Sequence, residues 1–334
     1  MVRISPRPVA ASVAELLEGA TDRQVMNPPE STSGARFEWV TIGGERLVLK
    51  FQDARVDCWM RASGDIAGRR FASLWGSGLL DAMPSVIDHA VVGAAVEDNV
   101  GAILLRDVSA GLLPSGDIPF GAGQHLRFLD HMATMHARFW GWHDDVGLTP
   151  LATRYLMLSP AVAAAEAALG SDAVVPKLMA TGWDLLPSVA PRLAEVVLPL
   201  LGDPTPLVDA LSEVPHTFVH GDWKAANLGS HPDGRTILLD WGEAPGEAAP
   251  TADLTWYLAL NAARLPESKD QTIASYQAAL ERQGVDTSPW WERAIGLELL
   301  GGMVQFGWEK ALGGAGHELA WWEERALHGA RWLG

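Results

Sequence analysis

The sequence is poor in cysteine and has no long hydrophobic run. Its single cysteine, Cys58, excludes both an intrachain disulfide framework and a cysteine-rich metal site. No stretch of 18 apolar residues is present, as a membrane-spanning helix would require. Residues 1–8 contain no hydrophobic signal segment. We therefore expect a cytoplasmic protein.

Basic residues are scarce relative to acidic ones. The chain has 25 lysines and arginines against 41 aspartates and glutamates, which gives a net charge of −16. This balance argues against nucleic acid or an acidic membrane as a partner, because both are bound through basic side chains. It is compatible with a cationic small molecule, although acidic surfaces also serve solubility alone.

The size and apolar content of the chain predict more than one hydrophobic core. Its 334 residues exceed what a single core usually supports, and 48% are hydrophobic. Short alternating strands are expected first and longer helical patterns after about residue 108. Strands are expected near residues 23–26, 36–41, 45–51 and 101–105, and helices over residues 123–142, 159–169, 186–201, 270–283, 289–312 and 318–332.

One segment concentrates polar residues that suit phosphoryl transfer. The apolar run 217–219 stops at His220-Gly221-Asp222, and Asn227 follows five residues later. Such a reaction needs a group that takes or orients the acceptor's hydroxyl proton, and ligands for the metal that neutralises the phosphates. Asp222 suits the first task.

A predicted hairpin brings Asn227 close to a second carboxylate. Residues 228–229 and 235–239 form its strands, and 232–234 (Pro-Asp-Gly) supply the turn. Because a hairpin brings its ends together, Asn227 and Asp240 are expected to be neighbours. Hard oxygen ligands of this kind suit Mg²⁺.

The segment resembles the catalytic region of the aminoglycoside phosphotransferase and choline kinase family, distant relatives of the protein kinases. The resemblance rests on His220-Gly221-Asp222, on Asn227, and on Asp240-Trp241-Gly242 in the place of a kinase Asp-Phe-Gly. It continues at Asp253, where the family has an aspartate that braces the catalytic loop. It also includes residues 135–139, which are similar to a helix of the family's larger lobe.

The resemblance implies an α+β, two-lobed, protein-kinase-like fold. Residues 1–108 would form a nucleotide-binding lobe with a small antiparallel sheet, and residues 109–334 a mostly helical catalytic and acceptor-binding lobe. The implied cofactors are ATP, or GTP, and Mg²⁺. His220 would orient the loop, and Lys224 is either a contact to the γ-phosphate or an ordinary exposed lysine.

Lys50 ends an alternating run, residues 45–51, and the resemblance makes it the contact to the α- and β-phosphates. Its alternative is a strand-end lysine that extends to solvent. Kinases hold this lysine with a glutamate on the following helix, but no glutamate lies between Lys50 and Glu97. Either Asp65 replaces it, or Lys50 is held differently, or the nucleotide site is altered.

Two further segments are expected to contact nucleotide. Residues 27–35 lack a multi-glycine signature, yet Ser33 and Gly34 offer a hydroxyl and backbone N–H groups to phosphates; the same composition also suits a plain turn. By resemblance, Arg106, Asp107 and Val108 form the hinge whose backbone hydrogen-bonds adenine.

The chain has 15 tryptophans, several of them near its carboxyl-terminal end. By resemblance this region builds the acceptor pocket, where indole rings stack on sugars or cations; ordinary helix packing is the alternative. The tryptophans concerned are Trp290, Trp291, Trp308, Trp321 and Trp322, with Glu292, Glu309, Glu323 and Glu324 beside them.

These observations predict a small-molecule phosphotransferase that acts on a hydroxyl group. The acceptor would be an aminoglycoside, another amine-bearing antibiotic or a metabolite. A second reading is a pseudokinase-like protein that binds a ligand without turnover, since Lys50 lacks its usual partner. A third is a metal-dependent hydrolase using His220 and Asp222, although no HExxH-type pair is present.

Overall fold

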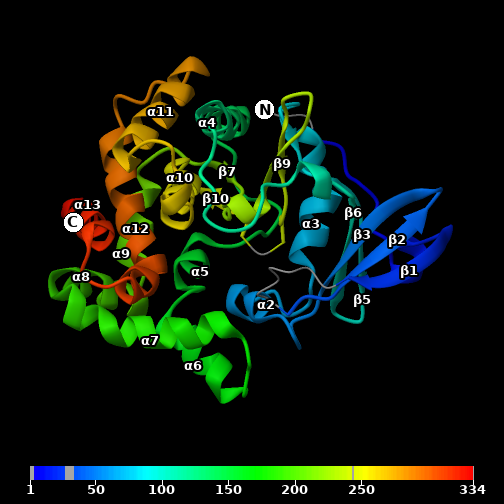
Figure 1. The fold of residues 1–334 in the computed structure, drawn as a ribbon, viewed down its shortest axis with the longest axis horizontal. Helices are drawn as coiled ribbons and strands as arrows, with labels where there is room; N and C mark the ends of the chain where they lie inside the picture. The colour runs from blue at the N-terminus through cyan, green and yellow to red at the C-terminus, as the bar shows by residue number, and fades with distance from the viewer. Residues whose placement is uncertain (1–3, 27–33, 243, 334) are drawn as a thin grey trace.

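A computed structural model describes residues 4–26, 34–242 and 244–333. Its amino-terminal part is a five-stranded antiparallel sheet in the order β1-β2-β3-β6-β5 (Figure 1, blue and cyan). The strands of this sheet are β1 (Ala20–Met26), β2 (Phe37–Ile42), β3 (Glu45–Gln52), β5 (Val91–Glu97) and β6 (Val100–Arg106).

Alternation along β6 gives the sheet two buried faces. Ala102 and Leu104 pack with Leu47 and Leu49 of β3 in one cluster. Ile103 lies on the opposite face and joins the main core through helix α3 (Arg70–Ser77). Successive side chains of a strand point to opposite faces of the sheet. The predicted run of apolar residues in β6 therefore supplies side chains to the clusters on both faces.

The rest of the chain is mostly helical, so the predicted α+β class is confirmed. Its helices are α4 (Ala122–Arg138), α5 (Leu151–Leu156), α6 (Pro160–Ala168), α7 (Val174–Val189), α8 (Pro191–Gly202), α9 (Thr205–Ser212), α10 (Thr251–Leu260), α11 (Lys269–Arg282), α12 (Trp291–Leu312) and α13 (His317–Gly329). The sheet region adds α1 (Val13–Leu16) and α2 (Cys58–Ser63). Single 3-10 turns are η1 (Leu80–Ala82), η2 (Ser109–Gly111), η3 (Ala225–Asn227), η4 (Ala262–Arg264) and η5 (Ala330–Trp332).

Helix α12 is the centre of the helical part and packs against α7, α10 and α13 (Figure 1). Its residues are buried on nearly all sides. Gly182 lets α7 approach closely, because a Cβ there would lie 2.2 Å from the carbonyl oxygen of Trp308. Among the described residues, no helix combines the length and the apolar character needed to cross a membrane.

The helix expected over residues 186–201 is two helices, so that prediction was wrong. α7 ends at Val189 and α8 begins at Pro191, with Ala190 at φ −145° and ψ 69° between them. Pro191 has no N–H to continue the first helix, and it disfavours the helical conformation of the residue before it.

Two small sheets connect the sheet region to the helices. The predicted hairpin forms β8 (Leu228–Ser230) and β9 (Thr236–Leu238), and β9 also pairs in parallel with β4 (Ile87–Asp88). The second sheet pairs β7 (Thr217–Val219) with β10 (Gly246–Ala248). The loop after β7 and the ends of the hairpin therefore lie next to the five-stranded sheet.

Candidate active site

The loop that follows β7 is held rigidly by Asp253 of α10. The fully buried Asp253 carboxylate accepts hydrogen bonds from the backbone amides of His220 (2.8 Å) and Gly221 (2.6 Å), and it contacts Nε2 of His136 at 3.1 Å. Gly221 has φ +84°, and a Cβ there would lie 2.1 Å from the carbonyl oxygen of Ala244. The glycine is therefore required for the chain to turn here.

His220 is a structural member of this loop. It is completely buried, and burial lowers the pKa of its imidazole despite the nearby carboxylates. Its Nδ1 accepts a hydrogen bond from the amide of Asp222 (3.2 Å), and its Nε2 donates to the carbonyl of Leu239 (2.9 Å). Both ring nitrogens are occupied, so a hydrolase that uses His220 as a metal ligand is disfavoured.

Asp222 lies in the cavity described below, with its carboxylate held by two neighbours. Oδ2 accepts hydrogen bonds from Nζ of Lys224 (2.7 Å) and Nδ2 of Asn227 (2.8 Å). Oδ1 is shielded from solvent and has no hydrogen-bond partner among the described residues. Burial lowers the pKa of Lys224, but Asp222 and Asp240 raise it by more, so the lysine remains charged beside the carboxylate.

Lys50 reaches across from β3 to Asp240. Its Nζ lies 2.5 Å from Oδ1 of Asp240. Burial by itself would raise the pKa of Asp240, but Lys50 and Lys224 lower it to about 2. Asp240 is therefore ionised at any physiological pH, and its φ of +67° is rare for a residue other than glycine.

The hairpin brings Asn227 and Asp240 together as its geometry predicts. Leu228 faces Leu238 in the register, and the amide of Leu239 donates to the carbonyl of Asn227 at 2.9 Å. Nδ2 of Asn227 makes both of its side-chain hydrogen bonds, to the Oδ2 and the backbone carbonyl of Asp222.

These donors fit Mg²⁺. The amide oxygen of Asn227 and the ionised carboxylate of Asp240 are hard oxygen ligands, and Mg²⁺ takes its remaining ligands from water and phosphates. Within the described parts of the chain, no group of three or more His, Cys, Asp and Glu side chains is placed to hold a metal.

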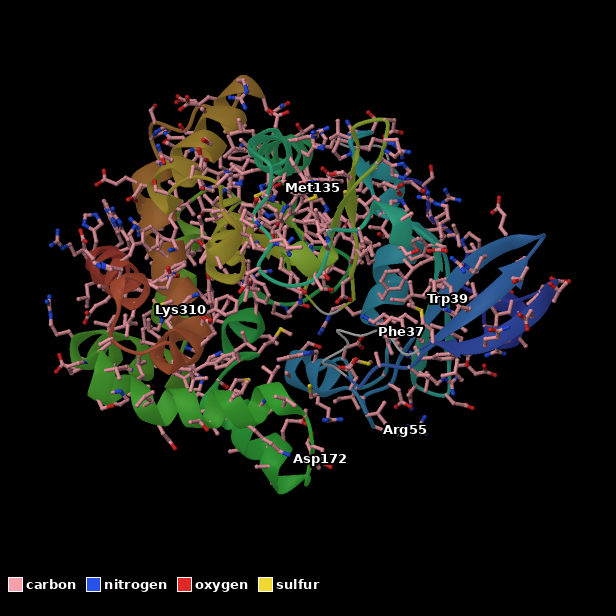
Figure 2. All side chains as sticks on the ribbon, in the orientation of Figure 1. Phe37, Trp39, Arg55, Met135, Asp172 and Lys310 are labelled. Carbon is pink, nitrogen blue, oxygen red and sulfur yellow. The ribbon has the colours of Figure 1, made fainter. Side chains whose placement is uncertain are left out.

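The candidate site opens into one cavity of about 810 Å³ between the sheet and the helical part, and Lys50 lies on its wall. Figure 2 shows Phe37, another lining residue, at the end of β2 that faces the helices. The sheet side contributes Met26, Phe37, Lys50, Trp59, Phe71, Val91, Ile103 and Leu105; the helical side contributes Met157, Leu158, Val175, Trp256, Leu260, Phe306, Trp308 and Glu309. Asp222, Lys224, Asn227 and Asp240 lie in the same cavity. This volume is typical of small-molecule sites.

Nearly the whole chain aligns with solved structures of small-molecule kinases. Choline kinase LicA from Streptococcus pneumoniae aligns at a TM-score of 0.51 with 12% identity, over 96% of each chain. LicA in complex with AMP aligns at 0.51 with 12% identity, over 94% of each chain. The chain has the protein-kinase-like fold.

That conclusion confirms the resemblance to the aminoglycoside phosphotransferase and choline kinase family at the level of the fold. Macrolide 2'-phosphotransferase MphH from Brachybacterium faecium aligns at a TM-score of 0.48 with 17% identity, over 96% of each chain. A scan against protein-family models and a search of curated proteins found no match.

Of the remaining predicted nucleotide contacts, the described residues Gly34, Arg106, Asp107 and Val108 are not among those that line this cavity. Ser33 falls outside the described residues. Gly34 has φ +82°, and a Cβ there would lie 2.8 Å from the carbonyl oxygen of Val56. The amide of Arg106 donates to the carbonyl of Ala90 (2.8 Å), so it is not free for adenine. Its guanidinium pairs with Asp88.

Asp107 and Val108 are placed at the corner that leaves β6. The carboxylate of Asp107 is engaged by Arg46 at 2.5 Å and by the amide of Ser109 at 3.1 Å. Their neighbours Leu105 and Ser109 line the cavity, whereas residues 106–108 do not. An adenine contact at Asp107 and Val108 remains a prediction.

The carboxyl-terminal tryptophans are mostly remote from the cavity. Of the nine aromatic and acidic residues singled out there, Trp308 and Glu309 line it. Trp290 precedes the first residue of α12 and Trp308 lies near its end, a separation of roughly 27 Å at 1.5 Å per residue. Trp290 instead borders a shallow surface groove with Trp140.

Five aromatics that line the cavity were missed by the sequence reasoning: Phe37, Trp59, Phe71, Trp256 and Phe306. Trp256 and Phe306 contact each other edge to face, with ring centroids 4.9 Å apart. α10 and α12 are apolar on nearly every face, so no periodicity distinguishes the side that meets the cavity.

Proposed function

We propose that this protein is an ATP-dependent phosphotransferase that phosphorylates a hydroxyl group of a small molecule. The observation that carries the proposal is the meeting of Lys50, Asp222, Asn227 and Asp240 on one cavity wall, from β3, the loop after β7 and both ends of the hairpin. A cation for phosphates, a carboxylate for a proton and two oxygen ligands are the parts that phosphoryl transfer needs.

In this proposal the residues have separate tasks. Lys50 holds the α- and β-phosphates, and Asn227 and Asp240 hold Mg²⁺, which when bound would neutralise charge on the triphosphate. The acceptor oxygen forms a bond to the γ-phosphorus while the bond to the β,γ-bridging oxygen breaks, and ADP leaves. Asp222 accepts or orients the hydroxyl proton.

Lys224 is proposed to move from Asp222 to the γ-phosphate when nucleotide binds. It is the closest cation to Asp222, and its side chain is one-third exposed, so it has room to turn. The nucleotide itself is assigned to the sheet side of the cavity, with residues 1–108 as the nucleotide-binding lobe and 109–334 as the acceptor-binding lobe. Gly34, Ser33 and residues 106–108 remain proposed contacts.

The helical side of the cavity favours an acceptor with a substantial apolar portion and an amine. Trp256, Phe306 and Trp308 supply aromatic surface, and Glu309 supplies a carboxylate that is already paired with Lys310 at 2.8 Å. An ammonium group could share Glu309 and lie against indole faces. We propose amine-bearing antibiotics or metabolites of this kind as the acceptor class.

The first experiment measures ATP and GTP consumption with Mg²⁺ across aminoglycosides, other amine-bearing antibiotics, choline, amino sugars and simple sugars. Product is confirmed by its added phosphate mass. The Asp222→Ala variant is expected to lose roughly 10² or more in turnover, the scale of general-base catalysis, while it keeps nucleotide affinity. Turnover like that of the wild type in this variant would overturn the assignment of Asp222.

A second candidate function is nucleotide binding without turnover. It is favoured by one observation: each carboxylate of the site is paired with a lysine, Lys224 with Asp222 and Lys50 with Asp240. A protein of this class would bind ATP in a titration, yet release no phosphorylated product with any acceptor. Any product whose formation depends on Asp222 excludes it.

A further inference from the structure

Arg264 is a nearly buried cation on the wall of the cavity. It ends η4, the 3-10 turn that follows α10, and it is 7% exposed. It follows Trp256 and Leu260 at intervals of four residues, and all three line the cavity together with Asn261. The side of α10 that carries aromatic surface into the cavity therefore ends in a guanidinium group.

The guanidinium of Arg264 is held in place by contacts that bring no negative charge. Its Nε donates to the carbonyl of Ile118 at 2.9 Å, and its Cζ lies over the ring of Phe120 at 4.9 Å from the centroid. The amide of Phe120 in turn donates to the carbonyl of Arg264 at 2.8 Å. The N–H groups on Nη1 and Nη2 have no acceptor among the described residues, so most of the donors of this side chain are unused.

Arg264 differs in this respect from the other cations that line the cavity. Those are paired with a carboxylate of the same cavity: Lys50 with Asp240 and Lys224 with Asp222. Within the described parts of the chain, no aspartate or glutamate forms an ion pair with Arg264. A charge that is taken out of water without a counter-ion is costly, so an anion bound in the cavity would stabilise it.

Arg264 is connected to the loop that carries Asp222 through one buried residue, Asn261. The carbonyl of Asn261 accepts the amide of Arg264 at 2.8 Å, and its Oδ1 accepts the amide of Ala225, also at 2.8 Å. Arg264 therefore belongs to the helical side of the cavity, whereas Lys50, the proposed contact to the nucleotide, belongs to the sheet. An anion at Arg264 is accordingly assigned to the acceptor.

We propose that Arg264 is a specificity-determining residue that binds a carboxylate or phosphate group of the hydroxyl acceptor. This inference rests on the proposed function and narrows its acceptor class to compounds that carry an anionic group besides the hydroxyl. Nη1 and Nη2 form a planar fork that matches two oxygens of either group. The acceptor supplies the counter-charge that the described residues do not.

The test uses pairs of hydroxyl compounds that differ in one anionic group: L-serine and L-serinamide, glycerol 3-phosphate and glycerol, and glucosamine 6-phosphate and glucosamine. Binding to the full chain is measured by titration calorimetry, and turnover with Mg²⁺ and ATP by the added phosphate mass. In at least one pair the wild type is expected to bind the anionic member at least about tenfold more tightly. The carboxylate and phosphate pairs show which of the two groups the site takes.

The decisive variant is Arg264→Gln, which keeps an N–H donor for the carbonyl of Ile118 and loses the charge. Its preference for the anionic member is expected to fall to within about threefold, whereas a purely structural loss would weaken both members of a pair equally. Arg264→Met removes the same charge and tests the same point should Arg264→Gln fail to fold. An unchanged preference in the variant that folds overturns the inference.

The matched control is Arg138→Gln. Nε of Arg138 also donates to a backbone carbonyl, that of Ala82 at 3.3 Å, but Arg138 is not among the residues that line the cavity. This variant should keep the preference of the wild type. Affinity for Mg²⁺-ATP should be equal in wild type and Arg264→Gln; a tenfold loss would assign the guanidinium to the nucleotide and overturn its role toward the acceptor.

The outcomes separate this inference from the function on which it rests. A preference that depends on Arg264, without phosphorylated product from any compound, supports the anion site and contradicts the phosphotransferase. Product formed at equal rates from neutral members by wild type and Arg264→Gln, with no preference in any pair, supports the phosphotransferase and overturns the role of Arg264.

Discussion

At the scale of single residues, the site is a set of charges that balance one another in the absence of nucleotide. Lys224 neutralises Asp222 and Lys50 neutralises Asp240. Such pairs are stable only while both members stay charged, and the lowered pKa of Asp240, about 2, ensures this for the carboxylate. Under the proposed function, phosphate oxygens would replace the carboxylates as partners of the lysines, and the metal would replace Lys50 as the partner of Asp240.

The first prediction at this scale concerns Asp240. The Asp240→Ala variant should lose the part of ATP affinity that depends on Mg²⁺, because Asn227 alone is a weak site for a hard cation. The measurement is the shift in melting temperature caused by ATP with and without Mg²⁺; 100-fold saturation of the wild type should add roughly 2.7 kcal/mol to its free energy of unfolding.

The matched control for Asp240 is Asp233→Ala at the opposite end of the same hairpin. Asp233 is half exposed and contacts Arg235 within the turn. It should respond to Mg²⁺-ATP as the wild type does. An undiminished Mg²⁺ effect in Asp240→Ala would remove this residue from the metal site.

At the scale of elements, the loop that follows β7 depends on the first turn of α10. Asp253 binds two consecutive loop amides, and His136 from α4 approaches the same carboxylate. The sequence marked Asp253 as a brace, and its hydrogen bonds to the loop are as expected. These hydrogen bonds therefore hold α10 and the loop after β7 in a fixed relative position.

Asp253→Asn is expected to weaken the attachment of the loop after β7 to α10. The side chain of asparagine has one oxygen and one NH₂ group, so the NH₂ group must face one of the two backbone N–H groups. This leaves a buried donor without an acceptor, at a cost of about 1–3 kcal/mol. Chemical denaturation should report this loss. Asp130→Asn, at a surface pair with Arg282, should change the free energy of unfolding by no more than about 0.5 kcal/mol. Equal stabilities of the two variants would contradict the brace.

At the scale of the whole molecule, the free energy of unfolding is expected to depend on pH through histidines that are shielded from solvent. Burial lowers the pKa of each of four imidazoles, those of His89, His125, His131 and His220. The unfolded chain therefore binds these protons near pH 6.5 while the folded chain does not. Their contribution to stability is complete above about pH 6.5 and is lost as the pH falls further, at up to about 1.4 kcal/mol per pH unit for each histidine.

Glu298 of α12 opposes this trend. It is fully buried beside Tyr155, and burial raises its pKa to about 7. The folded chain holds a proton there that the unfolded chain has released above about pH 4.5, so this group favours folding at the lower end of the range. The stability lost through the four histidines is expected to exceed the stability gained through the one glutamate. We therefore expect the free energy of unfolding to fall as the pH is lowered from 6.5 to 5.5.

The prediction is checked by urea denaturation at pH 7.5, 6.5 and 5.5. Glu298→Gln should make the pH dependence steeper, since it removes the opposing group, and His131→Gln should make it shallower. A free energy of unfolding that rises as the pH falls through this range would show that the histidines do not dominate.

The sequence by itself determined the backbone course of residues 217–240, because its geometry is local. A strand that stops at His220, a hairpin with a Pro-Asp-Gly turn and the two oxygen-bearing residues at its ends are fixed by a few neighbouring residues. Alternation likewise predicted β3, and a continuous apolar run predicted β6. The α+β class was implied by the family resemblance, and the change from alternating to helical periods along the chain agrees with it.

Only the tertiary structure decided which distant side chains meet at the site. The contact of Lys50 with Asp240 joins residues 190 positions apart, and nothing in the local pattern specifies it. The same holds for Arg61 with Glu166 and for Trp256 in the cavity wall. Their positions depend on how α2, α6, α10 and α12 pack, and helices that are apolar on most faces leave their orientation to that packing.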